Sequence, residues 1–211
     1  DAIARGLPRV RGLQGYEGHL GWTDRDGAWS GYDELTALAR ALELGTDGVV
    51  LTSGSHGFAH ALAHPDLRGG PWQHQIGCGT LVLSDVASRV PADAIGVAPA
   101  AFVASRVVAR PGPGRITLDA GSKAIAPDRA PPACAVLGHP ELVPERASEE
   151  HLPVAVTAGA APARDQLLLL VPDHVCTTVN LYRHALYVRG DRIVGTGAIE
   201  AAGRPAPWGE R

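Results

Sequence analysis

The sequence of 211 residues contains no methionine and only one lysine, Lys123, against eighteen arginines. It has no run of about eighteen apolar residues and no charged-then-apolar leader, so neither a membrane span nor a signal peptide is supported. A cytoplasmic location is therefore the default expectation. Because residue 1 is not methionine, we expect the sequence to be a piece of a longer protein.

Concentrated charge of one sign is also missing. The net charge is -3 and the charged residues are scattered, which argues against the clustered basic face that holds nucleic-acid phosphates. Nucleic acid is not an expected partner. The three cysteines, Cys78, Cys134 and Cys176, are odd in number and widely spaced, which favours reduced thiols or a metal ligand over a disulfide framework.

What is present is an ordinary globular composition, with 45% hydrophobic and 19% charged residues, enough for one large domain or two small ones. The first part of the chain alternates between strand and helix patterns. Residues 9–18 favour a strand that carries Tyr16, and a helix is predicted to enter at Ser30 and to stop at Gly45. The apolar run at 48–51 is typical of a buried parallel strand, so the pattern predicts a βαβ unit.

The pattern changes after residue 71 to short β-like runs separated by Gly and Pro, which predict an all-β region. Hairpin turns are predicted at 111–114 and 190–191, and the Pro- and Ala-rich residues 127–164 are expected to form loops. The predicted strands are residues 79–84, 101–109, 115–119, 166–171 and 185–188. The predicted fold class is therefore α/β followed by all-β.

The pair His174 and Cys176 is the sharpest local signal. Two potential ligands at i and i+2 on an extended segment point from the same face, and imidazole with thiolate is a combination typical of zinc sites. One such pair also recurs by chance. The alternative is a core thiol beside a surface histidine.

A second signal is the small-residue loop at 52–57, which directly follows the predicted buried strand. Ser53, Gly54 and Ser55 can present backbone N–H groups and two hydroxyls to a phosphate, and a helix is expected to begin after them. An ordinary strand-to-helix turn is the alternative. Lys123 follows a predicted hairpin outside the βαβ region, so we expect it to form a structural ion pair rather than a Schiff base.

Taken together, six segments resemble the D-threonine aldolase and D-serine dehydratase family of fold-type III pyridoxal-phosphate enzymes. They stand in the order in which the family has them, and they span most of the chain. The segments are GLQGYEGHL at 12–20, LTSGSHGFAHAL at 51–62, WQHQIGCGTLVLSD at 72–85, RITLDAGSKAI at 115–125, SEEH at 148–151 and PDHVCTTVNLY at 172–182.

The resemblance implies a homodimer whose subunits each contain a (β/α)8 barrel that binds pyridoxal 5'-phosphate and an attached β-domain that binds the metal. Residues 1–72 would be the C-terminal part of the barrel, incomplete as given, and residues 73–211 the β-domain with its metal site. Ser53, Gly54 and Ser55 would hold the cofactor phosphate and Tyr16 would lie near its ring. The remaining expected site residues, the zinc ligands, are His174 and Cys176.

The expected reaction is lysis of a small-molecule β-hydroxy D-amino acid. A thiolate ligand selects zinc over harder metals. The pattern His-x-Cys at 174–176 resembles that of the dehydratases, whereas the segment TTVNLY that contains its next residues resembles the aldolases. D-serine dehydratase activity is the first expectation, with D-threonine aldolase activity and racemisation as alternatives. His174 is the candidate catalytic base in the aldolase reaction, provided that the metal does not occupy it fully.

The family's cofactor-binding lysine sits on an early barrel strand, and this sequence starts at a late one. We therefore expect the chain to be inactive without the missing N-terminal barrel segment. The alternative of another class is a lysine-free module that binds a cofactor without catalysis. The sequence does not specify which β-hydroxy D-amino acid fits the pocket.

Overall fold

The computed structural model describes residues 10–203, and the chain divides into two compact units. The first unit contains the residues up to Val82 together with Val90–Val97, and the second contains Leu83–Arg89 and the residues from Ala98 on. Each unit has its own hydrophobic core. Within the described residues, no helix is both long and apolar enough to cross a membrane.

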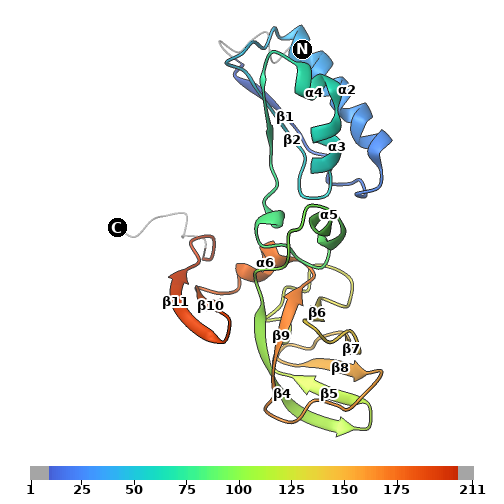
Figure 1. Cartoon of the computed structure of the whole chain (residues 1–211), viewed down its shortest axis with the longest axis vertical. Helices are drawn as coiled ribbons and strands as arrows, with labels where there is room; N and C mark the ends of the chain where they lie inside the picture. Colours follow the sequence, from blue (N-terminus) through green and yellow to red (C-terminus); the bar gives the residue numbers. More distant parts are fainter. Residues whose placement is uncertain (1–9, 204–211) are drawn as a thin grey trace. The chain divides into compact units, whose positions relative to one another are not determined.

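The first unit is a three-stranded parallel sheet with helices on one side (Figure 1). Its strands, β1 (Gly12–Gly15), β2 (Val49–Thr52) and β3 (Gln73–Ile76), pair in the order β1-β2-β3. The helices beside the sheet are α2 (Arg25–Ala41), α3 (Phe58–Ala63) and α4 (Pro65–Gly69), whereas the short α5 (Arg89–Asp93) begins at the last residue of a segment of the second unit. The succession β1-α2-β2 confirms the predicted βαβ unit; the first residue of the predicted strand, Arg9, lies outside the described residues.

Helix α2 covers the sheet with one apolar face. Asp24 caps its N-terminus, because the carboxylate accepts a hydrogen bond from the N–H of Gly27 at 3.0 Å. The helix therefore begins at Arg25, and the predicted entry at Ser30 is wrong. Its buried residues recur at helical spacing and are Ala28, Tyr32, Thr36 and Ala39.

The second unit contains a six-stranded antiparallel sheet, in the order β6-β9-β4-β5-β8-β7. The two end strands, β6 and β7, lie beside each other, so that the sheet nearly closes around its core. The long strand β4 supplies two neighbouring pairings, with β9 and with β5. The strands are β4 (Val103–Gly112), β5 (Arg115–Leu118), β6 (Cys134–Val136), β7 (Leu142–Pro144), β8 (Leu152–Val156) and β9 (Leu167–Pro172).

Two of the predictions made for the residues after 71 are wrong. Residues 127–164 are not all loops, because β6, β7 and β8 lie within them. These strands have only three to five residues and two of them contain proline, which hides the alternation of apolar and polar positions. The predicted strand at 79–84 is instead a 3-10 turn, Thr80–Val82, whose Leu81 packs against Phe58.

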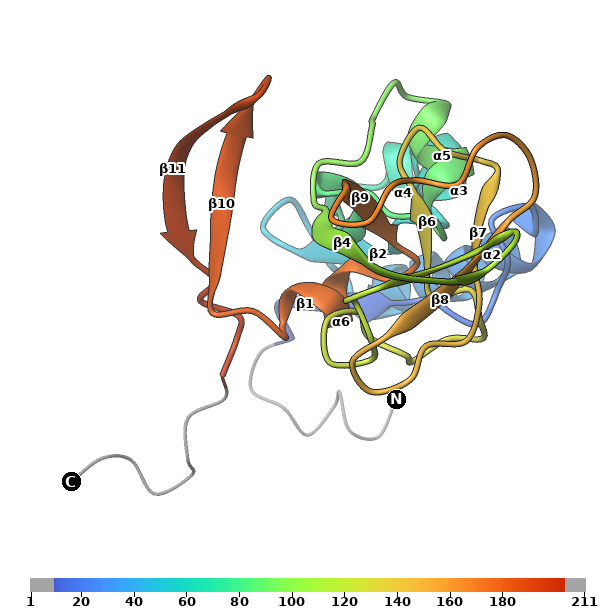
Figure 2. The ribbon, with the colours of Figure 1, turned by 90° about the horizontal axis from the view of Figure 1, so that it is seen from below.

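Both predicted hairpins are confirmed. β4 turns into β5 with Gly112 paired to Arg115, and Gly114 takes a positive φ of 67° there. The second hairpin joins β10 (His184–Arg189) to β11 (Arg192–Ala198) and stands apart from the six-stranded sheet (Figure 2). Its large apolar side chains are exposed, and they are Leu186, Tyr187, Val188, Ile193 and Val194.

We predict that Leu170→Ala destabilises the second unit by about 2–5 kcal/mol, because Leu170 is fully buried in the core between β4 and β6. Leu169→Ala is the matched control on the same strand. Its side chain is 38% exposed, so the free energy of unfolding should change by less than about 1 kcal/mol. Urea unfolding of both variants measures the difference, and equal losses would contradict the core assignment.

Candidate functional site

Strand β9 leads directly into the short helix α6 (Val175–Val179), and His174 is the N-cap residue between them. His174 keeps an extended backbone (φ −131°, ψ 102°), whereas Cys176 lies in the first turn of the helix and is exposed. The expectation that both residues lie on one extended segment is wrong, because the strand has ended and the two-residue period no longer applies. Both residues nevertheless flank the same helix start.

Asp128 holds this helix start from one side. Its Oδ2 lies 2.6 Å from Nδ1 of His174, and its Oδ1 accepts a hydrogen bond from Oγ1 of Thr177 at 3.0 Å. Burial acts to raise the pKa of Asp128, but the hydrogen bonds with His174 and Thr177 outweigh burial and lower it. The sequence analysis missed Asp128, since it lies 46 residues before His174 in a stretch taken for a loop.

The bond to Asp128 fixes the ring of His174 through one nitrogen. A histidine that binds a metal through Nε2 commonly donates its Nδ1–H to a carboxylate in this way. Within the described part of the chain no hydrogen bond to Nε2 is found. The geometry thus fits a ligand histidine and equally fits a base that a carboxylate orients.

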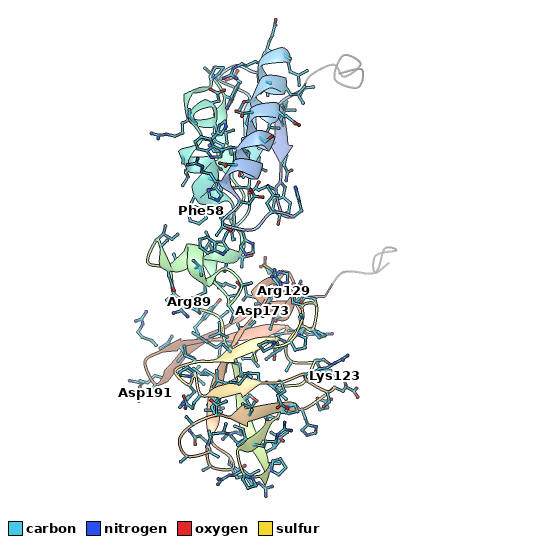
Figure 3. The ribbon with its side chains drawn as sticks, turned by 90° about the vertical axis from the view of Figure 1, so that its right-hand side faces the viewer. Phe58, Arg89, Lys123, Arg129, Asp173 and Asp191 are labelled. Atoms are coloured by element: carbon cyan, nitrogen blue, oxygen red, sulfur yellow. The ribbon has the colours of Figure 1, made fainter. Side chains whose placement is uncertain are left out.

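Asp173 adds a further carboxylate at the end of the turn, next to Arg129 (Figure 3). Oδ2 of Asp173 lies 3.8 Å from Nε of Arg129. Burial raises the pKa of Asp173, and the neighbouring charge of Arg129 only partly opposes this effect. Negative charge therefore gathers around the residues that precede α6.

The donor set at this turn fits zinc in kind, since it offers one imidazole nitrogen and one thiol sulfur. It is not a complete cage. Among residues 10–203 no group of three or more His, Cys, Asp or Glu side chains is arranged to hold a metal. A catalytic zinc site usually has three protein ligands, so His174 and Cys176 supply only part of the donor set that such a site needs.

The loop after β2 has features of a phosphate cradle. Ser53 takes a positive φ of 53°, and its hydroxyl oxygen is buried without a hydrogen-bond partner among the described residues. Ser55 is also buried, but its Oγ accepts a hydrogen bond from the N–H of Leu81 at 3.1 Å. Helix α3 follows the loop as expected. The hydroxyl of Ser53 also lies near the phenol of Tyr32, whose pKa burial raises and this hydroxyl acts to lower, so Ser53 is a donor that a bound phosphate oxygen would share with Tyr32.

Tyr16 lies against this loop, one residue beyond the end of β1. A Cβ at Gly54 would lie 2.9 Å from Cε2 of Tyr16, so the glycine allows the ring to approach the backbone. The Tyr16 side chain is 69% exposed. The structure therefore brings Tyr16 and the serine loop together within one unit.

Glu17 complicates the phosphate interpretation. Its carboxylate lies against Gly57, where a Cβ would collide with Oε1, and it also lies near the buried hydroxyl of Tyr32. Burial and then the charge of Glu17 raise the pKa of Tyr32 far above its usual value. At one end of the loop, Ser53 can donate a hydrogen bond to a phosphate. At the other end, beside Gly57, lies the carboxylate of Glu17, which would repel a phosphate.

Lys123 forms the predicted structural ion pair. Its Nζ lies 2.7 Å from Glu149 and 3.0 Å from Glu150, on the surface of the second unit (Figure 3). The hydrogen bonds to Glu149 and Glu150 raise the pKa of Lys123. A raised pKa opposes the neutral amine that attack on a carbonyl needs.

Comparison with known proteins finds similarity along most of the chain. Residues 100–188 match the family model described as a putative serine dehydratase domain. D-threonine aldolase from Arthrobacter sp. is 38% identical over 103 residues, which are 48% of this chain and 27% of that enzyme. The crystal structure of D-threonine aldolase from Filomicrobium marinum superposes with a TM-score of 0.74 at 25% identity, over 92% of this chain and 53% of that one.

D-threo-3-hydroxyaspartate dehydratase from Delftia sp. HT23 has the same fold at 22% identity, with a TM-score of 0.59 over 84% of this chain and 52% of that one. A form of D-threo-3-hydroxyaspartate dehydratase with a cysteine replaced by alanine has been solved metal-free. The matched part of this chain covers about half the length of these two solved relatives. It covers 27% of the D-threonine aldolase from Arthrobacter sp..

We predict that an alkylating reagent modifies the three thiols of the native protein in the order Cys176, Cys78, Cys134. Cys176 is exposed, whereas burial raises the pKa of Cys78, and it raises the pKa of Cys134 to about 12. Only the thiolate reacts. Mass spectrometry of timed iodoacetamide reactions measures the order, and fast native labelling of Cys134 would contradict its place in the core.

Proposed function

Because the chain belongs to the family of D-threonine aldolases and D-serine dehydratases and matches its C-terminal part, we propose that it takes part in a lyase reaction on β-hydroxy D-amino acids that depends on pyridoxal 5'-phosphate and zinc. The barrel part, expected at residues 1–72, would also include β3 (Gln73–Ile76), because β3 pairs in parallel with β2, and the six-stranded sheet would belong to the attached metal-binding domain. The observation that carries this proposal is the helix start at Val175, where Asp128 orients His174 beside an exposed Cys176.

In this proposal His174 holds zinc through Nε2 and Cys176 holds it as a thiolate. Zinc would act as a Lewis acid on the β-oxygen of the substrate. Asp128 would keep the His174 ring in the tautomer with the proton on Nδ1 and would make Nε2 a better ligand. The open coordination positions would receive water or the substrate hydroxyl.

The cofactor would lie against the first unit. Ser53 would donate its unpartnered hydroxyl to the phosphate, backbone N–H groups at Gly54 and Ser55 would complete the cradle, and Tyr16 would lie beside the ring. When bound, pyridoxal phosphate stabilises negative charge that develops at Cα of an amino acid. Lys123 is held by Glu149 and Glu150, so we propose that the lysine of the cofactor is one that this chain does not contain.

Dehydration of a substrate such as D-serine is our first proposal, because a thiolate ligand selects zinc over harder metals. Aldol cleavage is the second candidate, and the pair His174 and Asp128 favours it. Asp128, 2.6 Å from Nδ1 of His174, would orient this histidine as a general base toward a hydroxyl proton, a role open to it only where the metal does not occupy Nε2. A homodimer belongs to the proposal as well, and the exposed apolar side chains of the hairpin β10–β11 support an interface there.

We predict that the purified full-length protein, supplied with both cofactors, converts D-serine to pyruvate and ammonia. Cys176→Ser should lose zinc and at least about a hundredfold in kcat/KM, because a first ligand of the metal is gone. Cys134→Ser is the control for the loss of a thiol from the same region, since Cys134 is buried in the core and pairs with Pro172 at the end of β9. Zinc analysis and a coupled pyruvate assay measure both variants. Glycine and acetaldehyde from D-threonine would favour the aldolase alternative, and full turnover in chelator would contradict the metal.

A separate prediction concerns the cofactor loop. Ser53→Ala should weaken pyridoxal-phosphate binding by about tenfold, the equivalent of one hydrogen bond to a charged group. Ser84→Ala is a matched control, because Ser84 also has a buried, unpartnered hydroxyl and a positive φ of 55°, but lies in the second unit. Titration of cofactor absorbance measures the two affinities. Equal affinity in wild type and Ser53→Ala would remove the phosphate role of Ser53.

A further inference from the structure

The start of α6 is held from a second side by the segment Leu83–Arg89, which belongs to the same unit. Two backbone hydrogen bonds join the segment to the end of β9: the N–H of Val86 donates to the carbonyl of Pro172 at 3.0 Å, and the N–H of Ala87 donates to that of Asp173 at 3.3 Å. Residues some ninety positions apart in sequence therefore fix one turn.

Asp85 is the side chain that completes this contact. It is 1% exposed, and its Oδ2 accepts a hydrogen bond from the N–H of Val175 at 3.0 Å. Its Oδ1 accepts from the N–H of Ser88 at 2.8 Å and from the hydroxyl of Ser88 at 2.6 Å. A buried carboxylate is costly unless its oxygens are satisfied, and these three donors satisfy both of them.

The hydrogen bond from Val175 to Asp85 matters because of where Val175 lies. Val175 is the first residue of α6 and stands between His174 and Cys176. A helix of five residues is too short to hold its own shape, so the direction of its first turn depends on the contacts that fix its backbone. Asp128 fixes the His174 ring, and Asp85 fixes the backbone from which both side chains extend.

We propose that Asp85 is a positioning residue for the metal pair: it holds the backbone between His174 and Cys176 in the conformation in which imidazole and thiolate reach one metal ion. This inference rests on the proposed metal site and deepens it. Asp85 is the last residue of the segment WQHQIGCGTLVLSD at 72–85, and its sequence neighbours do not indicate this role. It touches neither metal nor substrate and acts through the N–H of Val175.

The variant that tests this role is Asp85→Asn, which keeps the size of the side chain. An amide offers one acceptor oxygen in place of two, so either the N–H of Val175 or the N–H of Ser88 loses its partner. The matched control is Asp119→Asn. Oδ1 of Asp119 likewise accepts a hydroxyl bond, from Ser105 at 2.7 Å, and a backbone bond, from Arg106 at 2.8 Å, but on β4 and β5.

Zinc alone is the probe, bound to the full-length protein in competition with a chromophoric chelator. We expect Asp85→Asn to weaken zinc binding by about 10–100-fold, the usual loss when the support behind a metal ligand is removed. Only Oδ1 of Asp119 accepts these two bonds and the amide oxygen of Asn can still accept both, so Asp119→Asn should leave the zinc Kd within about twofold. With Co²⁺ in place of zinc, Asp85→Asn should change the thiolate-to-cobalt absorption band, which a general loss of stability would not move.

The outcomes are separable. If Asp85→Asn lowers stability but keeps the wild-type zinc Kd and cobalt spectrum, Asp85 is only structural and the inference fails. If His174→Ala and Cys176→Ser also keep wild-type zinc binding, the proposed metal site itself fails. Should Asp85→Asn not fold, Ser88→Ala removes a single hydrogen bond from the same carboxylate and should weaken zinc binding by up to about fivefold. An unchanged Kd in Ser88→Ala then overturns the inference.

Discussion

The pairing of β9 with its two neighbours is the constraint on which the second unit depends. β9 is hydrogen-bonded to β6 on one side and to β4 on the other, so removing it would divide the sheet. Its buried positions, including Leu168 and Leu170, lie in the main core. The register of these pairings fixes where β9 ends, at Pro172, and therefore where the chain turns into α6. The candidate metal pair thus follows directly after a strand that is hydrogen-bonded on both sides.

Rigid placement at the end of a central strand suits a site that must hold ligands precisely. The turn itself is irregular and would not keep one conformation by backbone preference alone. Two carboxylates supply the missing constraint, Asp128 through side chains and Asp85 through the backbone N–H of Val175. Both come from segments distant in sequence, so the site forms only when the fold around it is complete.

The sequence predicts those parts of the fold that local patterns specify. The βαβ unit and both hairpins follow from periodicity and from turn residues, and the structure has them. The strands β6, β7 and β8 escape prediction, because short runs with proline such as Leu142–Pro144 show no clear alternation and form only through pairing with distant strands. The start of α2 was misplaced because the capping Asp24 lies ahead of the first clear apolar repeat.

The contacts of the candidate site likewise include some that the sequence can indicate and some that it cannot. Tyr16 and the loop at 53–55 lie together because the carboxyl ends of the neighbouring parallel strands β1 and β2 lie at one edge of the sheet, a rule that can be applied from the sequence. The partners of His174 could not be predicted, because Asp128 has no distinctive spacing from it. The strand geometry assumed for His174 and Cys176 failed for a local reason: the helix begins between them.

Electrostatics gives a reason for a cation at this turn that is independent of the ligand pattern. Asp85, Asp128 and Asp173 all lie near the start of α6, and within the described residues the charges that act on Asp173 include only Arg129 and His174 as opposing groups. A positive ion at His174 would offset the surplus of negative charge. The carboxylates that fix the geometry of the turn, Asp128 and Asp85, are thus also part of the negative charge that favours a cation there.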